Sequence, residues 1–304
     1  MPTLSTSEIS PPLWRSMLFI PAHVDKFVDK AHTRGADAII LDLEDSVPET
    51  EKEHARDNLL TAAIKVSTNG ADVLVRINSR LRLAIRDLEA AVHPSIRAIV
   101  IPKVVSDQQL KEVSEVIAEL EIERSMKVGE IGLVALVESP DALSRLAQIA
   151  NSCPRLLAMT IGSEDFSTAT GMIPSAENLL LPNQQLLFAC RAAGRLPLGF
   201  VGSIADYSDP LAFEQTITRA KNMGFRGAFC IHPSQVPIMN EGYSPTELQV
   251  NDAREVVNAY QEALKLGRGA AKFNGKMVDV PVVLRAEEIL RTTELIAHRN
   301  SRTI

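Results

Sequence analysis

Carboxylate side chains follow several apolar runs of this 304-residue chain, each at the point where its run ends. The acidic residues in these positions are Asp42, Glu44, Asp45, Glu138, Glu164 and Asp165. Carboxylates that share one cavity repel each other unless a positive charge lies among them. A divalent cation supplies such a charge, and carboxylate oxygens favour Mg²⁺ or Mn²⁺ over zinc. If the run ends meet in space, the pattern predicts a metal site.

Other polar residues end runs of the same kind, namely Arg76, Asn78, Lys103, Ser163 and His232. Lys103 would form a Schiff base only if it were strongly desolvated. Structural roles stay open for this whole set. In that interpretation the acidic residues 42–45 cap the next helix or pair with Arg56. Arg76 would then be a structural partner of Asp45, and His232 a hydrogen-bonded framework residue.

Eight strand-like runs would position these side chains. They cover residues 16–20, 37–43, 72–77, 97–101, 131–137, 155–161, 198–203 and 227–231. Seven of them are nearly continuous apolar runs, as expected for strands that are covered on both faces. The run at 198–203 has the weakest pattern of the eight.

Helical patterns lie between the runs. Apolar residues at 24, 27, 28 and 31 share one helix face. Ser106 stands three residues before Gln109, which is the spacing of a capping box. Ser139 followed by Pro140 has the residue types of a helix N-cap and first helical position.

The alternation of eight strands with helices predicts an α/β fold, a (β/α)₈ TIM barrel over residues 1–240. A doubly wound open sheet is the alternative, although no G-x-G-x-x-G follows the first run. The carboxyl ends of barrel strands converge on one mouth, where the polar residues above would meet. Residues 241–304 predict a C-terminal helical extension, with helices at 245–267 and 284–298 and a loop at 267–275. We expect this extension to be a lid or an oligomer contact.

Composition excludes some classes of protein. The net charge of −6 and the lack of a basic run argue against nucleic-acid binding. The longest stretch without a charged residue is 14 residues, shorter than the about 18–20 that a membrane helix needs. Three widely spaced cysteines, Cys153, Cys190 and Cys230, indicate a reducing compartment. The N-terminus has no features of a secretory signal, so we expect a cytoplasmic protein.

At these same residues the sequence resembles the citrate lyase β-subunit-like branch of the HpcH/HpaI aldolase superfamily, which includes malyl-CoA and citramalyl-CoA lyases. The matching segments follow one another in the family's order over nearly the whole chain. They are RSMLFIPA (15–22), DAIILDLEDSV (37–47), VRIN (75–78), IVIPKV (99–104), LVES (136–139), GSEDF (162–166), GFRGAFCIHPSQ (224–235) and FNGKMVDVPVV (273–283).

The resemblance implies a trimeric or hexameric TIM barrel that binds Mg²⁺ and acts on acyl-CoA or acyl-carrier thioesters. Matched by motif, Glu138 and Asp165 would be the metal ligands, and Arg76 would bind substrate oxygens. Asp279 would be the acid/base, reaching the mouth of a neighbouring subunit.

The reaction so implied is reversible cleavage of a 3-hydroxyacyl thioester into an acyl-CoA and a 2-oxo acid such as glyoxylate or pyruvate. In this hypothesis Glu44 and Asp45 orient metal-bound water and Arg76, while Lys26 and Lys30 meet the CoA phosphates. Two other hypotheses stay open. One is a class II-type aldolase that acts on free 2-oxo acids without CoA, and the other is a non-catalytic subunit or binding protein on the same barrel.

Overall fold

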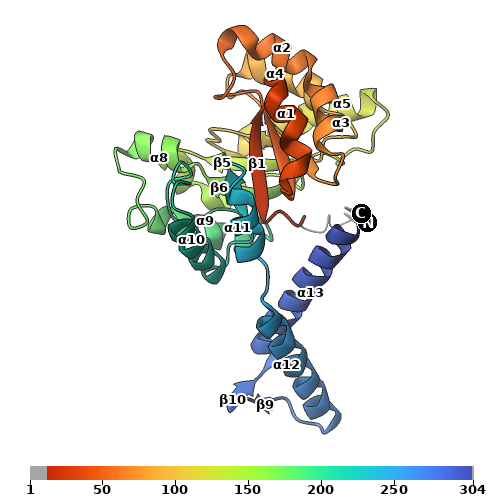
Figure 1. Ribbon diagram of the computed structural model, residues 1–304, viewed down its shortest axis with the longest axis vertical. Helices are drawn as coiled ribbons and strands as arrows, with labels where there is room; N and C mark the ends of the chain where they lie inside the picture. The colour runs from red at the N-terminus through yellow and green to blue at the C-terminus, as the bar shows by residue number, and fades with distance from the viewer. Residues whose placement is uncertain (1–11, 303–304) are drawn as a thin grey trace. The chain divides into compact units, whose positions relative to one another are not determined.

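Eight parallel strands form one curled sheet in the computed structural model, which describes residues 12–302 (Figure 1). Their order around the sheet is β7-β6-β5-β4-β3-β2-β1-β8. The strands are β1 (Ser16–Pro21), β2 (Ala38–Asp42), β3 (Asp72–Arg76), β4 (Ala98–Ile101), β5 (Gly132–Val137), β6 (Leu156–Ile161), β7 (Leu196–Pro197) and β8 (Ala228–Cys230). Strands of this sequence are buried on both faces because one face lines the barrel core and the other is covered by helices.

Two backbone hydrogen bonds close the sheet between its first and last strands in this order. The amide of Arg226 donates to the carbonyl of Pro197 at 3.2 Å, and the amide of Gly199 donates to the carbonyl of Gly227 at 2.8 Å. These bonds join the segment around β7 to the segment that begins β8. The predicted α/β barrel is therefore confirmed, and the open-sheet alternative is wrong.

The seventh strand differs from its predicted place at 198–203. It consists of Leu196 and Pro197, and residues 198–200 continue without regular structure. Gly199 has a φ of +137°, outside the range of extended strands, so the chain turns away from the ladder there. Pro197 has no amide hydrogen to donate, which also shortens the strand.

Helices follow the strands and cover the outside of the barrel (Figure 1). They are α1 (Asp25–Ala31), α2 (Lys52–Asp57), α3 (Leu59–Val66), α4 (Leu81–Ala91), α5 (Asp107–Glu123), α6 (Pro140–Ser144), α7 (Leu146–Ala150), α8 (Ser163–Thr170), α9 (Leu180–Ala192), α10 (Pro210–Met223) and α11 (Gln235–Gly242), with 3₁₀ turns at His32–Arg34 and Glu49–Glu51. The N-caps predicted at Ser106 and Ser139 are confirmed, because their hydroxyls accept from the amides of Gln109 and Ala142. Among the helices of residues 12–302, none combines the length and the apolar character needed to cross a membrane.

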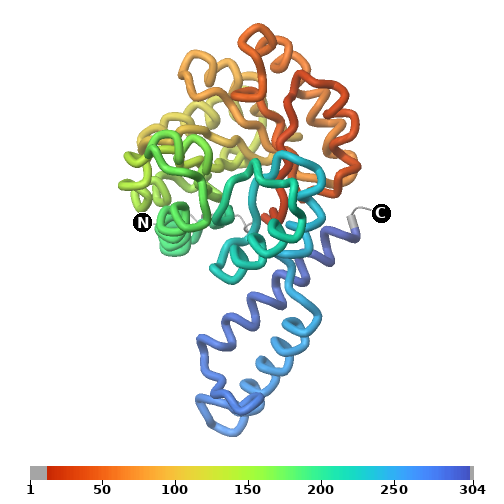
Figure 2. Tube along the Cα trace, turned by 60° about the vertical axis from the view of Figure 1, so that its left-hand side comes forward, coloured from red at the N-terminus to blue at the C-terminus, as the bar shows by residue number. Residues whose placement is uncertain are grey.

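A second compact unit begins at Glu241. Its long helices, α12 (Glu247–Lys265) and α13 (Val280–Arg302), pack along each other (Figure 2). An antiparallel hairpin, β9 (Ala271–Phe273) and β10 (Lys276–Val278), joins them where the sequence predicted only a loop. Asn274 and Gly275 form its turn with φ values of +47° and +77°, the backbone of a two-residue type I′ turn.

We predict that Gly227→Ala destabilises the barrel. A Cβ atom at this position would lie 1.7 Å from the carbonyl oxygen of Trp14, which is far inside contact distance. Relieving that clash requires a backbone shift at the barrel seam, so the free energy of unfolding should fall by at least about 1–3 kcal/mol. Urea unfolding measures it. Gly202→Ala is the control, since its nearest neighbours would lie at 3.8 Å. Equal midpoints for the two variants would contradict the prediction.

Candidate active site

A cavity of about 360 Å³ lies at the carboxyl ends of the barrel strands. The polar residues that line it include Asp42, Asp45, Arg76, Glu138 and Asp165. These five residues come from four different strand ends, and the structure brings them together as the barrel requires. Aromatic and aliphatic side chains form the rest of the wall, among them Phe19, Leu136, Phe200, Phe229 and Ile231.

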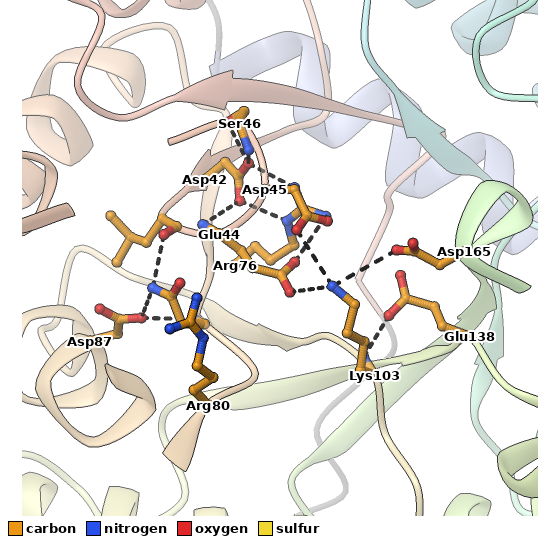
Figure 3. Close-up of polar contacts among 12 residues, drawn as sticks. Asp42, Glu44, Asp45, Ser46, Arg76, Arg80, Asp87, Lys103, Glu138 and Asp165 are labelled. Carbon is orange, nitrogen blue, oxygen red and sulfur yellow. Dashed lines mark hydrogen bonds and ion pairs between the residues drawn. The ribbon is translucent and has the colours of Figure 1, made fainter. Parts of the chain in front are cut away.

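Arg76 and Asp42 form a two-pronged ion pair (Figure 3). The sheet register places them opposite each other at the ends of β3 and β2. Arg76 Nε and Nη2 each donate to one carboxylate oxygen of Asp42 at 2.7 Å. Burial works to raise the pKa of Asp42, but the hydrogen bonds and charge of Arg76, together with the hydrogen bonds from Ser46 and the Glu44 amide, hold that pKa below its ordinary value. The guanidinium also lies over the ring of Phe19, 4.6 Å from its centroid.

The structure excludes one of the structural roles that the sequence left open for these acidic residues and contains contacts of the others. Arg56 pairs with Asp87 at 3.1 Å, so the predicted pairing of Arg56 with residues 42–45 is wrong. Asp42 does accept from local backbone amides, those of Glu44 and Ser46, as a capping residue would. Asp45 is a secondary partner of Arg76, because its carboxylate lies 3.7 Å from the guanidinium.

Lys103 joins the acidic residues of β2 to the opposite side of the cavity. Its ammonium donates to Glu44 Oε1 at 2.9 Å and lies 3.4 Å from Asp45 and 4.0 Å from Asp165. Burial opposes this charge, yet the neighbouring carboxylates raise the pKa of Lys103 above its ordinary value. A Schiff-base lysine needs a lowered pKa, so the structure argues against that role.

Glu44 is buried and completes this cluster. Its Oε2 atom lies 3.4 Å from Arg76 Nη1 but makes no hydrogen bond within residues 12–302. Burial raises the pKa of Glu44, and the hydrogen bond from Lys103 and the charge of Arg76 offset this only in part.

The presence of Arg76 and Lys103 changes one expectation from the sequence, namely that all the clustered carboxylates need a divalent cation. Arg76 and Lys103 set two positive charges against the three carboxylates of Asp42, Glu44 and Asp45, so most of the repulsion among them is offset without an ion. Within residues 12–302 no group of three or more His, Cys, Asp or Glu side chains is arranged as a metal site. The argument for a metal therefore narrows to Glu138 and Asp165.

Glu138 follows β5 and is almost fully buried at the cavity, beside the half-exposed Asp165 in the first turn of α8 (Figure 3). Burial raises the pKa of Glu138 to about 8, and the negative charges of Asp165 and Glu44 add to this effect. The backbone amide of Lys103 donates to Glu138 Oε2 at 2.5 Å and partly opposes it. A buried carboxylate in a negative field gains from a cation. Mg²⁺ commonly uses one or two carboxylates and takes water or substrate as its other ligands, so this donor pair fits it.

Gly162 and Lys103 shape the surroundings of Glu138 in ways that the sequence did not predict. A Cβ atom at Gly162 would lie 2.5 Å from both Cγ and Oε1 of Glu138, so a side chain there would displace the carboxylate. Lys103 has a φ of +50°, which aims its amide at Glu138. Gly162 could have been recognised in the sequence, as the glycine of the GSEDF motif. The left-handed backbone of Lys103 has no corresponding signal in the sequence.

Several residues singled out in the sequence do not join the cavity. Lys26 and Lys30 are exposed on α1 and are absent from the lining that residues 12–302 form. His232 is exposed, stacks on Tyr207 with ring centroids 4.6 Å apart, and contacts Ser234 Oγ at 2.7 Å. These contacts are those of a framework residue.

Asp279 belongs to the second unit, directly before α13. Its carboxylate accepts from the backbone amide of Val282 at 3.4 Å, and its side chain is partly exposed. Its acid/base role stays a prediction.

We predict that Glu138→Gln changes how stability depends on pH. Between the ordinary pKa of 4.5 and the folded value of about 8, the folded protein keeps a proton that the unfolded chain releases. The resulting stability is fully present below pH 4.5 and is lost as the pH rises through 8, by up to about 1.4 kcal/mol per pH unit. Urea unfolding in EDTA should therefore show wild type losing stability relative to the variant from pH 5 to 8. Parallel curves would refute the raised pKa.

Proteins of one known family are similar to this chain over most of its length. The sequence profile of the HpcH/HpaI aldolase/citrate lyase family matches residues 15–233. The citrate lyase subunit beta of Escherichia coli strain K12 is 34% identical over 284 residues, which cover 92% of this chain and 93% of that protein. The L-malyl-CoA/beta-methylmalyl-CoA lyase of Rhodobacter capsulatus is 30% identical over 304 residues, covering 92% and 95% of the two chains.

A solved structure is similar over the same extent. The crystal structure of protein CitE from Mycobacterium tuberculosis, in complex with magnesium, acetoacetate and coenzyme A, has a TM-score of 0.72 and 30% sequence identity. The match covers 92% of this chain and 97% of that one. The chain therefore belongs to the HpcH/HpaI aldolase/citrate lyase family and is an enzyme of the lyase type, as the resemblance implied.

Proposed function

We propose that this protein is a Mg²⁺-dependent carbon–carbon lyase. It cleaves a 3-hydroxyacyl-CoA thioester into an acyl-CoA and a 2-oxo acid such as glyoxylate or pyruvate, and forms the same bond by Claisen-type condensation. The observation that carries the proposal is the pair Glu138 and Asp165 beside Arg76 in one cavity. The magnesium, acetoacetate and coenzyme A bound to the Mycobacterium tuberculosis protein support the same ligand classes here.

Glu138 and Asp165 would hold the ion, and the remaining ligands would be water and substrate oxygens. When bound, Mg²⁺ supplies a template and a Lewis acid for the oxygens of the 2-oxo acid portion. Mn²⁺ prefers the same hard oxygen donors and is an expected substitute. Gly162 keeps the space that the Glu138 carboxylate needs.

Arg76 binds and stabilises negative oxygen in this proposal. Asp42 holds Nε and Nη2, which fixes the plane of the guanidinium. Within the described part of the chain, Nη1 has the longer contacts with Glu44 and Asp45, at 3.4 and 3.7 Å, so it is the donor best placed to turn to substrate. A fixed donor aimed at charge that develops during reaction lowers the barrier without reorganising at that moment.

Asp279 would exchange the proton at the thioester α-carbon. It removes this proton in condensation and returns it to the enolate in cleavage. We infer a homotrimer or hexamer in which Asp279 serves the mouth of a neighbouring subunit. Lys26 and Lys30, both exposed, would meet the phosphates of CoA. A cytoplasmic location completes the proposal and is supported by the free thiols of all three cysteines.

We predict metal-dependent cleavage of at least one member of a panel of malyl-, methylmalyl-, citramalyl- and citryl-CoA. EDTA should abolish release of the 2-oxo acid and Mg²⁺ should restore it. Glu138→Gln and Asp165→Asn should each weaken Mg²⁺ binding at least tenfold in calorimetry, because each removes a charged ligand. Glu119→Gln, which removes an exposed carboxylate from α5, is the control. If the protein cleaved free 2-oxo acid aldols and none of the thioesters, it would be a CoA-independent aldolase. If wild type bound no Mg²⁺ in calorimetry, it would be a non-catalytic scaffold.

We predict that Asp279→Ala lowers kcat by about 10²- to 10⁴-fold, the usual contribution of a general acid or base. Mg²⁺ affinity should stay unchanged, since Asp279 is not among the proposed ligands. Asp252→Ala removes an exposed carboxylate from α12 of the same unit and is the matched control. Steady-state kinetics with the cleaved thioester measure the effect. A loss below tenfold would remove Asp279 from the role.

A further inference from the structure

Lys52 is a buried cation that lies outside the cavity lining. It is the first residue of α2 and is only 6% exposed. Its Nζ donates to the main-chain carbonyls of Leu43 and Glu44, at 3.0 Å each. Within residues 12–302 these two carbonyls are its hydrogen-bond partners. A buried ammonium needs such partners, so its charge is directed at the backbone of the loop that leaves β2.

That loop is held from both sides. On one side the Asp42 carboxylate accepts from the amides of Glu44 and Ser46, at 3.0 and 3.1 Å. On the other side Lys52 donates to the carbonyls of Leu43 and Glu44. Asn78 Nδ2 also donates to the Leu43 carbonyl, at 2.8 Å, and the Val47 amide to the Glu44 carbonyl, at 3.1 Å. Lys52 is the one charged donor among these groups, and it bridges both carbonyls. These contacts hold the backbone from which the Glu44 side chain extends.

Glu44 in turn contacts both Lys103 and Arg76. Its carboxylate lies 2.9 Å from Lys103 Nζ and 3.4 Å from Arg76 Nη1. A rotation of the peptide group that Lys52 holds would withdraw this carboxylate and shift both cations. Misplacement of reacting groups by about 1 Å costs on the order of 10²-fold in rate.

We propose that Lys52 is a positioning residue of the active site, which acts through the backbone of Leu43 and Glu44 on Arg76 and Lys103. The clause that concerns catalysis rests on the proposed lyase function. The clause that concerns the loop rests on the hydrogen bonds alone.

The test compares Lys52→Met, which removes the donor, with Lys52→Arg, which keeps a charged donor. Lys52→Gln keeps a neutral donor and serves if the Met variant does not fold. Arg195→Met is the matched control, because Arg195 also donates to two main-chain carbonyls, those of Ala150 and Cys153 at 3.1 and 3.3 Å. Arg195 precedes β7, at the opposite end of the barrel from the cavity.

Two measurements are made on each variant. Amide hydrogen exchange at Glu44 and Ser46 reports the loop, and steady-state kinetics with the thioester that wild type cleaves report the site. In Lys52→Met we expect exchange at these amides to rise at least tenfold and kcat to fall 10- to 100-fold, with KM changed less than threefold. In Lys52→Arg the exchange rates and kcat should stay near their wild-type values. In Arg195→Met the exchange rates and kcat should stay within threefold of wild type.

Unchanged exchange at Glu44 and Ser46 in the Met or Gln variant would overturn the proposal. A kcat loss no larger than that of Arg195→Met, in spite of faster exchange, would overturn its catalytic clause. Should wild type cleave no thioester, the lyase function fails, while the exchange measurement still decides whether Lys52 holds the loop.

Discussion

The site depends on the balance of charge between the cations Arg76 and Lys103 and the carboxylates that lie in and directly behind the wall of one cavity. Arg76 and Lys103 offset most of the charge of Asp42, Glu44 and Asp45, and these contacts fix the cations in turn. Burial raises the pKa of Glu138, the charges of Asp165 and Glu44 add to this, and no side-chain ion pair among the residues described offsets it. The imbalance is confined to one side of the cavity, which is where a divalent ion would be stabilised most.

Most of the barrel could be predicted from the sequence because its strands are covered on both faces. Continuous apolar runs mark β1 to β6 and β8, and local signals mark the helix starts at Ser106 and Ser139. The seventh strand was misplaced because residues 198–203 are apolar for another reason, as Phe200 lines the cavity. The hairpin at Asn274 and Gly275 carried a known turn signal that the prediction did not use.

The sequence predicts which residues belong to the site but not which contacts they make. A strand-end pattern brings Asp42, Arg76 and Glu138 to one mouth, since the fold alone requires it. It does not give the register that sets Asp42 opposite Arg76, because a shift of one residue would exchange the two faces of a strand. The strand-end pattern also does not predict the left-handed backbone of Lys103, because a left-handed residue is usually a glycine and this one is a lysine.

The short seventh strand has a consequence for the range of ligands that this barrel can admit. Five registered residue pairs join β2 to β3 on the acidic side, whereas only two join β6 to β7. A sector with few ladder bonds opens at lower free energy than its neighbours. The sector of β2 and β3, which carries Asp42 and Arg76, is thus held by more ladder bonds than the sector of β7, which leads to Phe200. Changes around β7 can therefore reshape the cavity for a different acyl group while the Asp42–Arg76 pair at the ends of β2 and β3 keeps its place.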